Sequence, residues 1–286
     1  MFPILIIGQH GQLARALKRS LLARQAPFET AGSAQMDLAS NPQAAQTLIE
    51  QGNYSAVINC AAYTNVDAAE TDCDNAMRLN AIAPTKMAAA CAAKDIPFIH
   101  ISTDYVFDGQ NKRPYMPEDL ICPINTYGLT KSEGEQGVLA ANGQSLVLRT
   151  SWLYNGTSSN FLTTMLRLAA TKSFLSIIDD QIGRPTYAGH LAEACLTALR
   201  QMPKKPKIYH VSNTGPAISW ADFAESIFRL KGHSTSVKRI TSDEFNSPAP
   251  RPAYSVLNVS AFEENFQHPL PSWQEGLKRA LMENTQ

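Results

Sequence analysis

The first 150 residues alternate short apolar runs with segments of helical character. The apolar runs predict strands at 4–7, 27–31, 56–62, 96–102 and 145–150. A continuous apolar run is typical of a strand buried on both faces, and strands that alternate with helices predict right-handed crossovers. The sequence therefore predicts the α/β class, as a Rossmann-like doubly wound parallel sheet whose ligand lies at the carboxyl ends of the strands.

A glycine turn joins the first predicted strand to the first predicted helix. It reads Gly8-Gln9-His10-Gly11-Gln12-Leu13-Ala14. Gly8 allows a tight turn, Gly11 lets a pyrophosphate approach the helix start, and Ala14 lets helix and strand pack closely. An ordinary strand-to-helix turn remains an alternative, but a glycine motif between a buried strand and a helix favours a dinucleotide site.

The end of the second predicted strand bears on the choice of cofactor. An acid that binds the ribose 2′-hydroxyl of NAD is expected roughly 20 residues after the glycines, yet Ala31-Gly32-Ser33-Ala34 contains none. The missing acid favours tolerance of NADPH, with Ser33 near the 2′-phosphate. No arginine is adjacent, so the sequence leaves both NADPH and NADH open.

Candidate catalytic groups lie between Ser102 and Lys131. Thr103 ends the fourth predicted strand, and Tyr127 and Lys131 follow four residues apart, which places both on one helix face. A protonated phenol beside a charged amine can give a proton to an oxygen that gains negative charge, and a threonine hydroxyl can hold that oxygen. Taken alone, the spacing also fits a surface tyrosine above a solvated lysine.

The alternation loosens beyond Tyr154. We therefore predict an NAD(P)-binding Rossmann domain over residues 1–150 and a smaller, mainly substrate-binding domain over 151–286. Strands near 174–178 and 208–212 are expected to return to the main sheet, so that the second domain is interleaved with the first.

Charge and cysteine content exclude several classes of function. The chain has 25 basic and 25 acidic residues, and zero net charge gives no electrostatic footprint for nucleic acid or a membrane surface. Five scattered cysteines without a CxxC pair or metal-ligand spacing predict a reduced, cytoplasmic protein and no assigned metal site. No stretch approaches the roughly 18 apolar residues of a membrane span.

Longer motifs extend over nearly the whole chain. They include Thr64-Asn65-Val66-Asp67-Ala68-Ala69-Glu70, Ser102-Thr103-Asp104-Tyr105-Val106-Phe107-Asp108-Gly109, Tyr127-Gly128 with Lys131, Arg149-Thr150-Ser151-Trp152 and Arg251-Pro252. On these residues the chain resembles the dTDP-4-dehydrorhamnose reductases, which belong to the extended short-chain dehydrogenase/reductase superfamily. The second and fourth motifs together are far more specific than the tyrosine–lysine spacing.

This resemblance implies NAD(P)H-dependent reduction of the C4 ketone of dTDP-4-dehydro-β-L-rhamnose to dTDP-L-rhamnose, for surface polysaccharide such as the lipopolysaccharide O-antigen. It implies Thr103, Tyr127 and Lys131 as catalytic residues, and Thr103, Asp104 and Trp152 as contacts to the dTDP-sugar. The residues that it places on NADPH or NADH, with those of the glycine turn, are Gly8, Gly11, Gln12, Leu13, Asp37, Leu38, Ala61, Ala62, Tyr63, Thr64, Tyr127 and Lys131. Some members bind magnesium at a subunit contact. The resemblance thus allows magnesium and a homodimer, although the sequence offers no ligands for the metal.

Two rival functions come from different classes. One is a sugar-nucleotide dehydratase or epimerase with tightly held NAD, or a reductase of another dTDP-4-keto-6-deoxy sugar. Dehydratases of this superfamily follow the active-site threonine with Asp-Glu, whereas Asp104 is followed here by Tyr105, which argues for simple reduction. The other rival is a non-catalytic NADP-binding regulatory subunit, such as that of methionine adenosyltransferase. The presence of Thr103, Tyr127 and Lys131 weighs against it.

Overall fold

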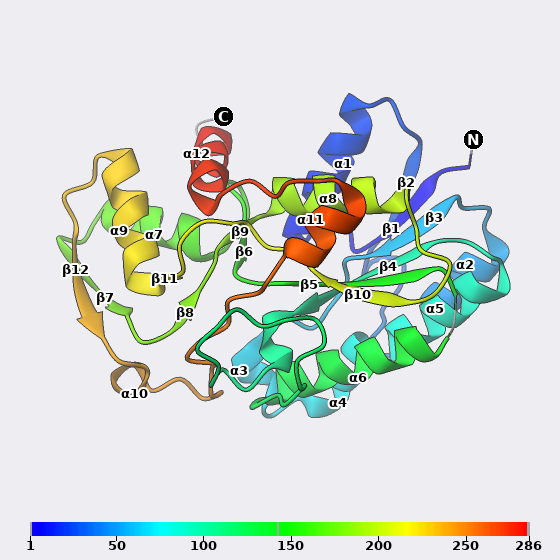
Figure 1. Cartoon of the computed structure of the whole chain (residues 1–286), viewed down its shortest axis with the longest axis horizontal. Coiled ribbons are helices and arrows are strands. Elements are labelled where there is room, and N and C mark those ends of the chain that lie inside the picture. The colour runs from blue at the N-terminus through cyan, green and yellow to red at the C-terminus, as the bar shows by residue number, and fades with distance from the viewer. Residues whose placement is uncertain (1, 142, 285–286) are drawn as a thin grey trace.

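A six-stranded parallel sheet forms the centre of the molecule. The computed structural model describes residues 2–141 and 143–284. Its main sheet has the order β10-β5-β4-β3-β1-β2, and all five strand pairs are parallel (Figure 1). The strands are β1 (Ile4–Ile7), β2 (Phe28–Ala31), β3 (Ala56–Asn59), β4 (Phe98–Thr103), β5 (Ser145–Thr150) and β10 (Lys207–His210). The predicted α/β class and doubly wound parallel sheet are confirmed.

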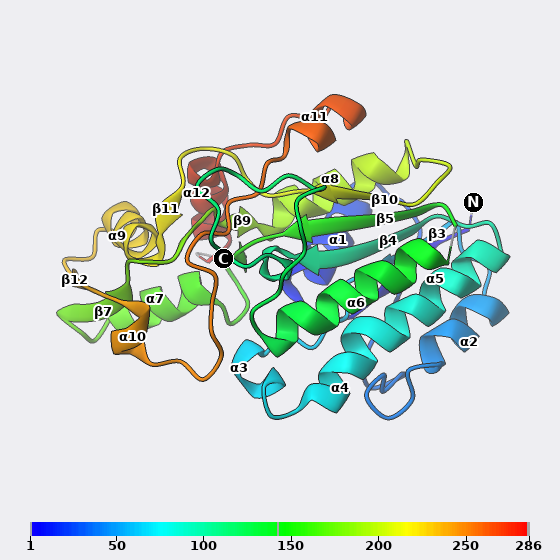
Figure 2. The same ribbon diagram turned by 60° about the horizontal axis from the view of Figure 1, so that its bottom comes forward.

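Helices cover both faces of this sheet, because its strands are apolar on both sides. One face packs against α1 (Gln12–Ala23), α8 (Ala188–Leu199) and α11 (Ser260–Phe266). The other face packs against α2 (Ala44–Gln51), α5 (Ala83–Ala93) and α6 (Thr126–Ala140), which run side by side in Figure 2. Two separate apolar clusters, one on each face, form the core of the larger part of the molecule.

The segment before α5 is helical and includes a wider turn. It contains the short helices α3 (Val66–Ala69) and α4 (Cys73–Met77), then a π-helical turn, η1 (Arg78–Ile82). Pro84 lies in the first turn of α5, directly after η1. The wider turn of η1 turns Asn80 inward, and its side chain bonds both backbone groups of Tyr63 and the hydroxyl of Thr130.

Smaller sheets and helices make up the remainder. β6 (Leu153–Tyr154) pairs with β9 (Thr186–Tyr187), β8 (Ile182–Gly183) with β11 (Ile218–Ser219), and β7 (Phe174–Ile178) with β12 (Ser236–Ile240). The helices of this part are α7 (Phe161–Ala169), α9 (Trp220–Lys231), α10 (Ser242–Phe245) and α12 (Trp273–Glu283). A third apolar cluster joins α7, α9 and α12.

One of the two strands expected to return to the main sheet does not do so. β10 lies beside β5 in the main sheet, whereas β7 pairs only with β12 in a separate two-stranded sheet. The prediction for 174–178 is wrong because β7 alternates exposed and buried residues, Phe174 and Ser176 being exposed. Such a strand covers one apolar face only, here against α7 and α9. The division at residue 150 stays a prediction.

A buried ion pair fastens α6 to the sheet. Arg149 of β5 and Glu135 of α6 are essentially inaccessible, and two parallel hydrogen bonds of 2.8 and 2.6 Å join them. The guanidinium also donates to the carbonyl of Pro117 at 3.0 Å and lies 5.1 Å from the ring centre of Phe107. Planar bidentate pairing of this kind fixes orientation as well as distance.

Breaking this pair should destabilise the fold strongly. Arg149→Met leaves the Glu135 carboxylate buried without its cation, so we expect the free energy of unfolding to fall by about 3–5 kcal/mol. Urea denaturation followed by circular dichroism measures the change. The control is Arg279→Ala, which removes an exposed pair with Glu275 and should cost less than about 1 kcal/mol. Equal losses for both variants would contradict the assigned role.

Candidate functional site

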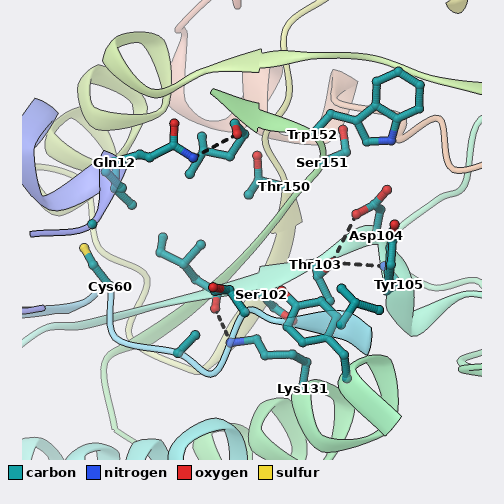
Figure 3. A pocket seen from close by; sticks show the side chains of 18 of the residues that line it. Gln12, Cys60, Ser102, Thr103, Asp104, Tyr105, Lys131, Thr150, Ser151 and Trp152 are labelled. Atoms are coloured by element: carbon teal, nitrogen blue, oxygen red, sulfur yellow. Dashed lines mark hydrogen bonds between the residues drawn. The ribbon is translucent and has the colours of Figure 1, made fainter. Parts of the chain in front are cut away.

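A cavity of about 530 Å³ opens at the carboxyl ends of β1, β3, β4 and β5. This volume is in the range of small-molecule and cofactor sites. Side chains from the main sheet, from α6 and from the C-terminal half face it (Figure 3). The predicted residues in its wall are Gly11, Gln12, Leu13, Ala61, Ala62, Thr64, Thr103, Asp104, Tyr127, Lys131 and Trp152.

Four predicted residues lie outside the wall of the cavity. Gly8 sits behind it, with φ +102°, and an added Cβ would lie 3.1 Å from the nitrogen of Ala61. Asp37 is exposed and bonds Ser40, and Leu38 is buried in the core under α2 and α5. Tyr63 is held by Asn80. Gly8 and Tyr63 therefore support neighbouring parts of the wall, and the assigned cofactor contacts of all four residues stay predictions.

The beginning of α1 offers backbone donors to the cavity. Gly11 is the N-cap and makes no side-chain capping bond, so the first N–H groups of the helix are available to an anion. An added Cβ at Gly11 would meet no atom within 4 Å, because the turn borders open space. The Gln12 amide is directed away, to the carbonyl of Leu153 at 3.0 Å and to Asn160, which ties α1 to the C-terminal half.

Thr103 is positioned at the junction of β4 and the 3₁₀ turn η2 (Asp104–Val106). Its hydroxyl accepts from the backbone N–H of Tyr105 at 3.1 Å and donates to the carboxylate of Asp104 at 3.1 Å. The side chain is 5% exposed. Its hydroxyl is close enough to the phenol of Tyr127 to lower the pKa of that group, so the two predicted catalytic residues lie beside each other.

Glycines permit the close approach of α6 that this contact needs. A Cβ at Gly128 would lie 2.1 Å from the carbonyl oxygen of Tyr105, and one at Gly134 would lie 1.9 Å from that of Asn80. Both distances are sterically prohibited, so any side chain would move the helix away. The N-cap Asn125 fixes the start of α6 by accepting from the N–H of Gly128 at 2.7 Å.

Burial shifts Tyr127 and Lys131, both on α6, toward their neutral forms. It raises the pKa of Tyr127 to about 12, with the Asp104 carboxylate adding to the rise and the Thr103 hydrogen bond opposing it. Burial likewise lowers the pKa of Lys131 to about 8, against the attraction of Glu135. The amine donates to the carbonyl of Ile101 at 2.6 Å. At neutral pH the phenol of Tyr127 is therefore protonated. The amine of Lys131 is mostly charged at that pH, but its pKa lies only about one unit higher.

Asp104 keeps a free acceptor atom in the wall. The side chain is 2% exposed, and its Oδ2 has no hydrogen-bond partner within the described ranges 2–141 and 143–284. Burial raises the pKa of this carboxyl to about 7, with the neighbouring hydroxyls of Ser255 and Thr103 opposing the rise. A buried polar atom without a partner costs free energy, and here a ligand hydroxyl in the cavity could satisfy it.

Trp152 lies at the far edge of the cavity on a strained backbone. Its φ is +46°, an uncommon value for a bulky residue. The indole stacks on that of Trp220 with ring centres 3.5 Å apart and 7° between the planes. Trp220 also lines the cavity but was not predicted. It begins a helix 68 residues after Trp152, and its local sequence indicates only a residue that packs on one side of that helix.

A family model described as RmlD substrate binding domain matches residues 2–286. The chain belongs to this family. It is 38% identical over 289 residues to the spore coat polysaccharide biosynthesis protein SpsK of Bacillus subtilis, covering 100% of this chain and 99% of the relative. It is also 38% identical to the dTDP-4-dehydrorhamnose reductase of Sinorhizobium fredii, with 96% of this chain and 95% of the relative covered.

A solved structure is similar along almost all of this RmlD-family chain. It is the dTDP-4-dehydrorhamnose reductase of Bacillus anthracis in complex with NADP, with a TM-score of 0.93, 34% identity and 99% of each chain covered. The resemblance inferred from the sequence motifs is thus confirmed. Within the described ranges, no group of three or more His, Cys, Asp or Glu is placed to hold a metal ion. No described helix is long and apolar enough to cross a membrane.

The raised pKa of Asp104 has a consequence for stability. Its folded-state pKa is about 7 against an ordinary value of 3.8, so the unfolded chain releases this proton first as the pH rises. Ionisation of Asp104 therefore lowers the free energy of unfolding as the pH rises from about 4 to about 7. Above pH 7 the free energy of unfolding stays lowered by this amount.

Asp104→Asn removes the ionisation. We expect the free energy of unfolding to exceed that of the wild type by roughly 4 kcal/mol at about pH 8 and by little at about pH 4. Urea denaturation at both pH values measures the difference. A variant that is less stable than the wild type at the higher pH would contradict the assigned cost of the buried carboxylate.

Proposed function

We propose that this protein is an NAD(P)H-dependent oxidoreductase that reduces the C4 ketone of dTDP-4-dehydro-β-L-rhamnose to dTDP-L-rhamnose. The observation that carries the proposal is the meeting of Thr103, Tyr127 and Lys131 in one wall of a cavity at the carboxyl ends of parallel strands. Relatives of this family named dTDP-4-dehydrorhamnose reductase, one of them in complex with NADP, support both the substrate and the cofactor.

The residues present fit a dinucleotide. The uncapped start of α1 at Gly11 suits a pyrophosphate, and the small side chains of Ala61 and Ala62 leave room along the end of β3. Lys131 would hold the nicotinamide ribose. Bound there, NADPH or NADH supplies the hydride to C4. Without an acid at the end of β2, we favour acceptance of NADPH, and Ser33 is exposed at that strand end.

Tyr127 is the proton donor in this mechanism. As C4 is reduced, its oxygen gains negative charge and takes the phenolic proton. The raised pKa of Tyr127 keeps that proton in place at neutral pH. The Thr103 hydroxyl lies in the same cavity wall and can orient the ketone oxygen by turning its proton from Asp104 to that oxygen. General acid catalysis from a positioned group is the chemistry that this pair supplies.

Lys131 stabilises the phenolate that remains. Its amine lies in the wall of the same cavity and carries a positive charge below about pH 8. An adjacent cation favours the charged form of an acid, so the ammonium lowers the cost of transferring the proton. Because Lys131 is 1% exposed, little water screens this interaction.

The sugar nucleotide would occupy the part of the cavity opposite α1. The free Oδ2 of Asp104 can accept from a sugar hydroxyl, and the Trp152 and Trp220 indoles provide an apolar face beside it. Asp104 is followed by Tyr105 and not by a second carboxylate. The site therefore lacks the acid–base pair that loss of water would need, which favours simple reduction.

The cysteines and one relative indicate the setting of this activity. All five cysteines are free thiols, which suits a reducing compartment and supports a cytoplasmic location. The product would serve surface polysaccharide, as the name of the relative SpsK suggests for that protein. A homodimer, and magnesium at a subunit contact, stay predictions.

Tyr127→Phe tests the proton donor. Removing the phenolic proton should lower kcat by about 10²–10⁴-fold while binding of NADPH persists. Turnover of the sugar is followed by the absorbance of the reduced nicotinamide. The matched control is Tyr115→Phe, whose ring stacks on Phe107 away from the cavity and which should retain kcat within a few-fold. Wild-type kcat in Tyr127→Phe would overturn the assignment.

The function itself is tested by oxidation of NADPH and NADH with dTDP-4-dehydro-β-L-rhamnose generated in situ. Rapid oxidation that depends on the sugar is expected, and the two rates give the cofactor preference. Binding of NADPH without oxidation would contradict the reductase and point to a regulatory subunit. NAD that remains bound through purification, with loss of water from the sugar nucleotide, would point to a dehydratase.

A further inference from the structure

Four hydrogen-bonding groups form an unbroken chain behind the catalytic lysine. The backbone N–H of Ala61 lies 3.0 Å from Oδ1 of Asn59, and Nδ2 of Asn59 lies 3.1 Å from Nδ1 of His100. Nε2 of His100 lies 3.2 Å from Nζ of Lys131. Asn59 on β3 and His100 on β4 are direct partners in the strand pairing. All three side chains are at most 1% exposed, so each must find its partners within the protein.

The backbone amide gives this chain a direction. An N–H group only donates, so the side-chain oxygen of Asn59 must face Ala61 and its NH₂ must face His100. The NH₂ donates to Nδ1 of His100, which then carries no proton. A neutral imidazole has one ring proton, and here it lies on Nε2, facing Lys131.

This direction favours one protonation state of the lysine. An uncharged amine has a lone pair, so Nζ can accept from Nε2–H of His100 and still donate to the carbonyl of Ile101. An ammonium has no lone pair. Protonated Lys131 would face another donor at 3.2 Å, unless His100 changed tautomer and the Asn59 amide turned away from Ala61.

We propose that Asn59 and His100 are positioning residues that stabilise the uncharged amine of Lys131, and thereby set the pH above which the active site loses its cation. This inference rests on the proposed function of the same site. It adds that the direction of this effect is fixed by the main chain, because a backbone N–H orients every group in the chain. Protonation of Lys131 then requires two other side chains to rearrange.

The other titratable groups near Lys131 do not produce the same stabilisation of its uncharged amine. On its own helix, Glu135 favours the ammonium but is held in the bidentate pair with Arg149 of β5. Asp104 of η2 bonds Thr103. Tyr127 is neutral over the same pH range, and burial raises the pKa of the Cys60 thiol at the end of β3 well above its ordinary value. The π-helical turn η1 contributes Asn80, an uncharged amide.

The molecule contains a second copy of the same arrangement, without a lysine. Oδ1 of Asn213 accepts from the N–H of Tyr187 at 2.8 Å, and its Nδ2 lies 2.7 Å from Nδ1 of His190. That Nδ2 also donates to the carbonyl of Pro271, which fixes the amide orientation. His190 is not in the cavity wall, so this pair is a matched control for the chain behind Lys131.

The first test determines the tautomer of His100 by long-range ¹⁵N–¹H NMR on the full-length protein at about pH 8.5. This measurement does not depend on enzyme turnover. The inference predicts that His100 carries its proton on Nε2, as His190 does. Comparison with a His100→Gln spectrum assigns the signal. A proton on Nδ1 of His100 in the wild type would overturn the inference, whatever the activity of the enzyme.

The second test uses Asn59→Asp. A carboxylate accepts from both Ala61 N–H and Nδ1–H of His100, so the chain reverses and Nε2 can accept from an ammonium. We expect the alkaline midpoint of the pH profile of kcat/KM to rise by about one pH unit or more, with His100 now protonated on Nδ1. Asn213→Asp should change the tautomer of His190 and leave the pH profile in place.

The outcomes separate this inference from the proposed function. A midpoint that rises in Asn59→Asp while His100 keeps its Nε2 proton would mean that the added charge acts alone, and it would overturn the inference. An unmoved midpoint in a folded variant would do the same. Absence of sugar-dependent oxidation in the wild type would instead overturn the reductase, while the NMR prediction would still stand or fall on its own.

Discussion

The seating of α6 against the ends of β4 and β5 is the constraint on which the site depends. Gly128 and Gly134 allow backbone-to-backbone contact, and the pair between Glu135 and Arg149 fixes the helix at that distance. Lys131 lies between these anchors and is excluded from water. Burial is the largest cause of the lowered pKa of Lys131. The close packing of α6 therefore also determines the protonation behaviour of its lysine.

Among the described residues, three of the buried polar atoms without a partner belong to residues that line the cavity. Oδ2 of Asp104 and the hydroxyls of Ser102 and Thr150 are buried without partners in the described part of the chain, and all three residues line the cavity. Each unpaired atom costs stability in the free protein. A ligand that hydrogen-bonds these atoms would recover this cost on binding.

Much of this arrangement was predictable because function sits where buried strands end. The apolar runs located β1, β3, β4 and β5, and parallel pairing then brought Gly11, Thr103 and Trp152 to one edge of the sheet. Side-chain direction was not predictable in the same way. Leu38 follows a strand but is drawn into the core by its apolar side chain. The 174–178 run failed as a main-sheet strand because its alternation suits a one-sided sheet.

Contacts set by strand register could not have been found from the sequence at all. Asn59 and His100 are 41 residues apart, and nothing local in either segment marks them, since an asparagine or a histidine inside an apolar strand fits ordinary satisfied polar burial. Only the pairing of β3 with β4 places them opposite each other, and only the adjacent helix brings an amine to the free ring nitrogen. A proton's position in such a chain is decided by the one member that cannot rotate, the backbone N–H of Ala61. In the proposed chain, the protonation state of Lys131 is governed by a peptide group three hydrogen bonds away from it.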